Sequence, residues 1–137
     1  MNVDKKEIQK FDDISYSWWD PQGPFKPLHM LNPVRTEFIK NRVMLNDKTL
    51  IGVGCGGGLL CENLASITKE VKGIDMSKDA IEIAKTHQTL KNLKIDYEAI
   101  SLDSLLAKSK KKYDVLTCME LVEHVPNPKK LIEDCVN

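Results

Sequence analysis

From residue 48 onward, short apolar runs alternate with segments of helical periodicity. The runs TLIGV, EVKGID, KIDYEAI and YDVLTCM are typical of buried strands. CGGGLLCENLAS and SKDAIEIAKTHQTLKN lie between them and predict helices, the second with Ser77 as its N-cap. Further helices are expected near ELVEHV and from Pro128. Strands separated by helices predict a parallel sheet with right-handed crossovers.

The first 47 residues have a different pattern. A helix is expected over residues 4–19, with an apolar stripe of Ile8, Phe11, Ile14 (or Ser15) and Trp18. The prolines and glycine of PQGPFKPLH predict an irregular segment. A second helix is expected after Asn32 as N-cap, with Pro33 in its first position, running to about Leu45. We expect its apolar side to hold Val34, Phe38, Ile39 and Val43.

These elements predict an α/β fold, the N-terminal part of a Rossmann-like sheet. We divide the chain into an N-terminal helical cap, residues 1–47, and an incomplete Rossmann-like domain, residues 48–137. Only about four strands fit, whereas a complete doubly wound domain has more, so we expect a chain truncated at its C-terminal end. A chain of 137 residues is too short for two independent cores.

Composition narrows the classes of partner. Twenty basic residues balance twenty acidic ones, which gives no electrostatic argument for nucleic acid as a partner. The run KSKKK, residues 108–112, is interpreted as a solvated loop. The N-terminus has no apolar core of a signal peptide, and no clear transit peptide is seen. The four cysteines show no CxxC spacing, so we expect reduced thiols in a cytoplasmic setting rather than disulfides or a zinc site.

The strongest candidate site is the glycine loop that follows the first strand. Gly54, Gly56 and Gly58 allow a sharp turn and close approach to a ligand. Asp75 ends the second strand, 21 residues after Gly54, where a carboxylate can accept hydrogen bonds from both ribose hydroxyls. A dinucleotide fingerprint requires a third glycine at the position of Leu59. The GxGxG spacing favours a nucleoside ligand without phosphate, namely S-adenosylmethionine, over a nicotinamide cofactor.

A second candidate site follows the fourth strand. Glu120, Glu123 and His124 have i, i+3 and i+4 spacing, which places them on one face of a helix. Two carboxylates and an imidazole can bind Mg²⁺ or Mn²⁺, and such an ion would lower the pKa of a bound phenol. Alternatively, His124 acts as a general base, or the three residues form a solvated helix face. The spacing leaves all three interpretations open.

Together the motifs resemble the ubiquinone-biosynthesis O-methyltransferases, a family of class I S-adenosylmethionine-dependent methyltransferases. The resemblance extends from Phe11 to about Pro128. It rests on the segments WWD, FKPLH, NPVR, VGCGGGLL, GID, AKTH and YDVLTCMELVEHVPNP. The glycine loop is shared by many methyltransferases, whereas the segments before it are specific to this family.

The resemblance implies roles for particular residues. It implies that S-adenosylmethionine contacts Arg35, Gly54, Asp75 and Met119, with Arg35 paired to the methionine carboxylate. It implies that Mg²⁺ is bound by Glu120, Glu123 and His124. It also implies that Trp18 and Trp19 cover the cofactor, although packing of the N-terminal helix is an equal alternative.

The implied reaction is methylation of an oxygen on a polyprenyl phenol or catechol. The resemblance further implies association with a ubiquinone-biosynthesis complex and peripheral contact with the inner membrane, on the matrix side in a eukaryote. Gly52 departs from the family pattern, which reads LDVGCGGG and has aspartate at this position. This departure and the missing strands motivate an alternative, a non-catalytic truncated remnant of the enzyme.

Overall fold

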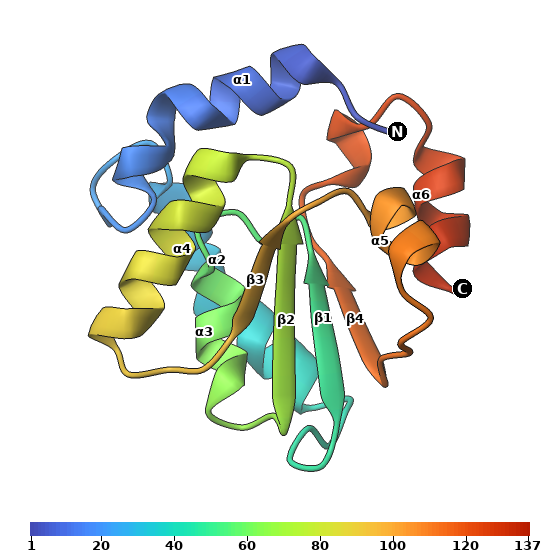
Figure 1. The fold of residues 1–137 in the computed structure, drawn as a ribbon. Coiled ribbons are helices and arrows are strands. Elements are labelled where there is room, and N and C mark those ends of the chain that lie inside the picture. The colour runs from blue at the N-terminus through green and yellow to red at the C-terminus, as the bar shows by residue number, and fades with distance from the viewer.

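The computed structural model describes residues 1–137 and contains one parallel sheet of four strands. The strand order is β3-β2-β1-β4, so the chain reverses direction across the sheet after β3 (Figure 1). The strands are β1 (Thr49–Val53), β2 (Glu70–Asp75), β3 (Asp96–Ala99) and β4 (Val115–Cys118). All three pairings are parallel, which confirms the predicted fold class.

Helices cover both faces of this sheet. In Figure 1, α2, α3 and α4 lie on one side of the sheet, whereas α5 and α6 lie on the other. The helices are α1 (Lys5–Ile14), α2 (Lys26–Lys40), α3 (Leu59–Ala65), α4 (Lys78–Leu90), α5 (Leu102–Lys108) and α6 (Pro128–Cys135), and the short 3-10 turns are η1 (Ser15–Ser17) and η2 (Val122–His124). No helix is both long and apolar enough to cross a bilayer.

The alternation of side chains along β1 divides the apolar interior into two layers. Leu50 packs with Leu64 of α3 and Ile81 of α4, whereas its neighbour Ile51 packs on the opposite face with residues of α5 and α6. Because successive strand residues point to opposite faces, a strand covered on both sides needs a continuous apolar run. TLIGV is such a run.

The second predicted helix begins earlier than expected. α2 starts at Lys26, has Pro27 in its first turn and contains Pro33 in its interior. A proline in the first turn lacks only an N–H that has no partner within the helix, so Pro27 is compatible with a helix start. The side chain of Asn32 donates to the carbonyl oxygen of Leu59 instead of capping the helix. Ile39 is buried as predicted, but the prediction was wrong for two apolar residues that are exposed, Val34 and Phe38.

Two elements between β3 and α6 differ from what the sequence predicts. The sequence reading did not identify α5, which is capped by Ser101 accepting from the backbone N–H of Ser104. The helix expected over ELVEHV is wrong, because only the 3-10 turn η2 forms there. Glu120 has φ +57°, a left-handed conformation that interrupts a helix, and it therefore separates β4 from η2.

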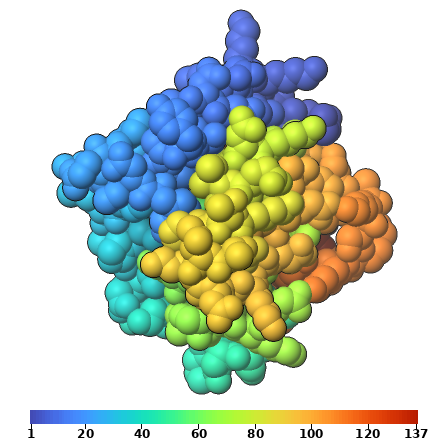
Figure 2. All heavy atoms as spheres, turned by 60° about the vertical axis from the view of Figure 1, so that its left-hand side comes forward, coloured from blue at the N-terminus to red at the C-terminus, as the bar shows by residue number.

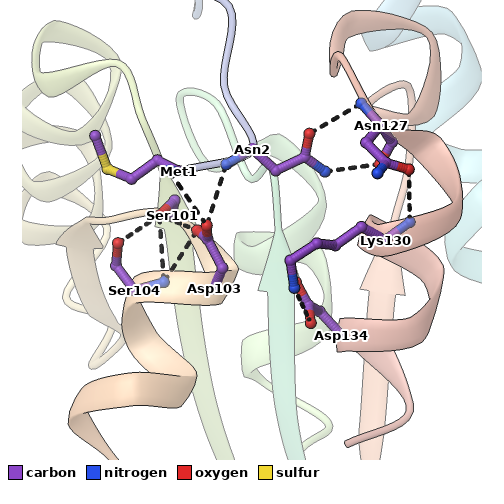
Figure 3. A network of polar contacts seen from close by, with 8 residues as sticks. All are labelled: Met1, Asn2, Ser101, Asp103, Ser104, Asn127, Lys130 and Asp134. Atoms are coloured by element: carbon purple, nitrogen blue, oxygen red, sulfur yellow. Dashed lines mark hydrogen bonds and ion pairs between the residues drawn. The ribbon is translucent and has the colours of Figure 1, made fainter.

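The N-terminal segment lies across the carboxyl ends of the strands and is fastened there. In Figure 2 its atoms lie against those of α4, and in Figure 1 the N-terminus lies beside the start of α6. Figure 3 shows that the backbone N–H of Asn2 donates to Asp103, 3.1 Å away, and its side-chain amide donates to the carbonyl oxygen of Asn127 at 2.7 Å. Further along, Glu7 Oε2 lies 2.7 Å from Nδ1 of His124, and Ser77 donates to Asp12.

The core predicts that alanine substitution of two leucines, one buried and one exposed, lowers the free energy of unfolding by very different amounts. Leu64 is 0% exposed in α3, so Leu64→Ala should lower the free energy of unfolding by about 2–5 kcal/mol, through lost burial and the cavity left behind. Leu90, at the end of α4, is 77% exposed, and Leu90→Ala should change it by less than about 0.5 kcal/mol. Urea denaturation followed by circular dichroism measures both. Equal losses would contradict the described core.

The contact between Glu7 of α1 and His124 predicts that the stability of the fold depends on pH. The side chains of Lys10 and His124 hold the pKa of Glu7 below its usual 4.5. Its carboxylate therefore stabilises the fold above pH 4.5, and this contribution is lost as the pH falls through the depressed pKa. Glu7→Gln should lower the melting temperature at neutral pH and show a smaller further loss on acidification than the wild-type chain.

Glu37→Gln is the matched control, because Glu37 pairs with Lys40 three residues away but has no long-range partner. Melting temperatures measured by scanning fluorimetry from neutral pH to about pH 3 should separate the two variants. The same pH profile for both would show that the Glu7–His124 contact contributes nothing to stability.

Candidate cofactor site

The carboxyl ends of the strands border a cavity of about 420 Å³. Its floor is formed by the loop after β1, the end of β2 and the loops after β3 and β4. Its cover is the N-terminal segment, whose predicted apolar stripe faces the cavity with Ile8, Phe11, Ile14 and Trp18. A mostly apolar cavity at this edge of an open α/β sheet, with a few polar groups, is the usual form of a small-molecule site.

The loop after β1 turns through three residues in the left-handed region. Gly54, Gly56 and Gly58 have φ of +71°, +54° and +92°, values that glycine adopts without the penalty of a side chain. The backbone N–H groups of Gly54 and Cys55 both donate to the carbonyl oxygen of Ile74, at 2.9 and 3.0 Å. The turn is therefore bonded to the end of β2 before any ligand is considered.

Asp75 completes this connection. One carboxylate oxygen accepts from the backbone N–H of Gly56 at 2.8 Å, and the other accepts from that of Ser77 at 2.9 Å. Burial raises the pKa of Asp75, while these two N–H groups oppose the rise. A carboxylate has about four lone-pair sites, so it can still accept hydroxyl protons from the cavity side. The predicted proximity of the glycine turn and this acid is confirmed.

The two tryptophans differ in their position relative to the turn. Trp18 is buried, stacks on Phe25 with ring centroids 3.7 Å apart, and lines the cavity. A Cβ at Gly56 would lie within 2.6 Å of its ring, so Trp18 packs directly on the glycine backbone. Trp19 lies outside the cavity, donates to the carbonyl oxygen of Gly57 at 3.0 Å and stacks on His87. Both therefore hold the turn, and Trp18 alone faces the cavity.

The residues predicted to contact the cofactor all border this cavity: Arg35, Gly54, Asp75 and Met119. Arg35 reaches it from α2, and its guanidinium lies 2.5 Å from a carboxylate oxygen of Glu120. The structure thus brings together residues that are far apart in the sequence. Their contacts with a ligand stay predictions.

The acidic cluster is not arranged as the sequence predicted. Without a helix over residues 120–125, Glu120, Glu123 and His124 do not share a helix face. Glu120 pairs with Arg35, and His124 pairs with Glu7. No group of three or more His, Cys, Asp or Glu side chains is placed to hold a metal ion. The residues as arranged do not fit the predicted Mg²⁺ site.

His124 nevertheless lies at the cavity wall. The Glu7 carboxylate can only accept, so the Nδ1 atom facing it carries the proton, and the neutral ring then keeps a free lone pair on Nε2. Nε2 is 3.8 Å from Glu123, too far for a hydrogen bond. Its arrangement is that of a base held by a carboxylate.

Sequence reasoning missed Ser101 and Asp103, polar residues that border the cavity after β3. They follow the third parallel strand, and Asp75 ends the second, so all three lie at the carboxyl ends of strands, which was the available signal.

A family model described as "Methyltransferase domain" matches residues 51–137. The chain is 46% identical over 134 residues to a ubiquinone biosynthesis O-methyltransferase of Paraburkholderia phytofirmans, and 45% identical over 135 residues to one of Coxiella burnetii. These matches cover 98% of this chain but only 58% and 57% of the relatives.

Among solved structures, magnesium protoporphyrin IX methyltransferase from Synechocystis PCC 6803, with bound S-adenosylmethionine, has a TM-score of 0.72 at 17% identity. The match covers 98% of this chain and 73% of that one. At this identity the likeness concerns the fold. The resemblance found in the motifs is confirmed by the relatives, and the chain belongs to the methyltransferase-domain family.

Proposed function

We propose that this chain binds S-adenosylmethionine and forms the cofactor-binding part of an O-methyltransferase acting on polyprenyl phenols or catechols in ubiquinone biosynthesis. The observation that carries the proposal is the hydrogen bond between Asp75 and Gly56, which holds a carboxylate beside a left-handed glycine turn at the cavity floor. The names of the relatives support the substrate class. The chain spans about 58% of the length of the first relative, so its activity and its substrate class are proposals.

The cavity fits the cofactor in size and chemistry. About 420 Å³ lies within the range of small-ligand sites, and the polar groups border the apolar space at separate places. Asp75 would accept from the ribose hydroxyls, the bare backbone at Gly54 would allow the methionine part to approach, and Met119 would pack beside it. When bound, S-adenosylmethionine supplies an electrophilic methyl group on its sulfonium sulfur.

Arg35 would bind the methionine carboxylate. Its partner here is the Glu120 carboxylate, which is half exposed, whereas the Arg35 side chain is 19% exposed. The exposed acid can turn toward solvent at little cost, whereas the guanidinium would remain at the cavity wall. Glu120 therefore occupies the place in which we expect the cofactor carboxylate to lie.

Methyl transfer further requires that the acceptor oxygen is aligned with the methyl group and that the acceptor hydroxyl loses its proton. The apolar stripe of α1 borders the cavity and would shield bound ligands from water, and Nε2 of His124 would accept the proton of the acceptor hydroxyl. Glu7 would stabilise the imidazolium that forms. No step is assigned to Mg²⁺, because no three of the His, Cys, Asp and Glu side chains are placed to hold a metal ion. The Mg²⁺ site implied by the resemblance stays a prediction.

Titration with S-adenosylmethionine by calorimetry tests the proposal. The wild-type chain should release or absorb heat and gain thermal stability, whereas Asp75→Asn should raise Kd about 10–100-fold, the loss expected for a charge-assisted hydrogen bond. Asp47→Asn, at an exposed position, is the control and should bind as the wild type does. Absence of both heat and stabilisation for the wild-type chain would favour the non-catalytic remnant.

The role of His124 has a separate test. Transfer of a labelled methyl group to a soluble catechol, in the longest form of the protein that folds, should fall about 10²–10⁴-fold in His124→Asn. Its affinity for S-adenosylmethionine should stay unchanged. An unchanged transfer rate would show that His124 only fastens α1.

A further inference from the structure

A row of four residues crosses the sheet just below the glycine turn. Tyr97 of β3 pairs with Gly73 of β2, Gly73 with Gly52 of β1, and Gly52 with Thr117 of β4. Residues in register on parallel strands point to the same face, here the face covered by α3 and α4. The row therefore has side chains at its two ends, Tyr97 and Thr117, and none at its centre.

Both central positions are covered by a buried side chain. A Cβ on Gly73 would lie 2.6 Å from the ring of Tyr97, and a Cβ on Gly52 would lie 2.7 Å from the sulfur of Cys61. These separations are far below the 3.5–4.0 Å of roughly optimal contacts between non-bonded carbon atoms. Cys61 is 2% exposed and projects from α3. Its thiol therefore occupies the space that a side chain at position 52 would need.

The same atoms form part of the cavity wall. Gly52, Cys61 and Thr117 all border the cavity, together with Gly54 and Cys55 of the turn. The hydroxyl oxygen of Thr117 and the Cβ of Cys55 lie 3.5 and 3.8 Å from the Cβ position of Gly52. Whatever fills this space therefore touches the sheet, the first turns of α3 and the glycine turn at once.

We infer that Cys61 is a positioning residue of the cofactor site and that Gly52 and Cys61 form a matched packing pair. The Cys61 thiol replaces a side chain on β1 and sets how closely α3 and the glycine turn approach the sheet. An aspartate at position 52, as in the family pattern, has no room while Cys61 keeps this position. The effect on cofactor affinity rests on the proposed function, whereas the packing relation does not.

The chemistry of the neighbouring thiol agrees with a packing role. A hydrogen bond with Cys61 and burial both raise the pKa of the Cys55 thiol. A thiol kept protonated in an apolar site is a poor nucleophile and behaves as a small apolar group. The pair of cysteines thus fills space behind the turn.

A double-mutant cycle tests the inference with Gly52→Ala, Cys61→Ala and the double variant, in reducing buffer. Gly52→Ala should lower the melting temperature by roughly 5–10 °C, because its methyl group meets the thiol. Adding Cys61→Ala should recover at least half of this loss. The Kd for S-adenosylmethionine should rise about tenfold in Gly52→Ala and return to within about threefold of wild type in the double variant.

Cys135→Ala is the matched control, because Cys135 lies on α6 and does not border the cavity. Combined with Gly52→Ala, it should give no recovery. If Gly52→Ala does not fold, recovery of folded protein by Cys61→Ala and not by Cys135→Ala supports the pair. Equal effects of Gly52→Ala with and without Cys61, or failure of the double variant to fold, would overturn it. If Cys61→Ala restores the melting temperature of Gly52→Ala but no variant binds S-adenosylmethionine, the packing pair is supported and the proposed function is rejected.

Discussion

The hydrogen bond from the Gly56 N–H to Asp75 connects the two strand ends on which the cavity depends. It crosses from the loop after β1 to the last residue of β2, beside the bonds from Gly54 and Cys55 to the Ile74 carbonyl. Burial of the carboxylate is unfavourable by itself, and the N–H groups of Gly56 and Ser77 offset this cost. The shape of the turn and the position of the acid are therefore one property of the fold, fixed before a ligand arrives.

The close approach of α3 to the sheet depends on the absence of side chains as much as on their presence. Gly52 and Gly73 lie side by side in the sheet, and Cys61 and Tyr97 fill the space above them. Considered alone, glycine in place of the aspartate of the family pattern at position 52 suggested a chain that has lost its catalytic function. In the structure it is one half of a contact, and the other half lies nine positions further along the chain, on α3.

Much of this architecture could be predicted, because the signals were local. The apolar runs defined the strands, and Ser77 marked the start of α4. The errors arose where long-range contacts override local pattern. The spacing of Glu120, Glu123 and His124 is helical, yet Glu120 pairs with Arg35 and His124 with Glu7, partners that no spacing rule can supply. α5 has only seven residues, too short for a clear period, and it was overlooked beside the basic run that follows it.

The fastening of Asn2 has a consequence for the order in which the molecule can form. Its partners lie 101 and 125 positions further along the chain, so they are synthesised well after Asn2. At a translation rate of about 5–20 residues per second, the first residues emerge many seconds before Asn127 exists. During that time the apolar stripe of α1 stays exposed, because the surface that it packs against has not yet formed. The nascent chain is therefore expected to build its sheet first and to close the cavity as a late event.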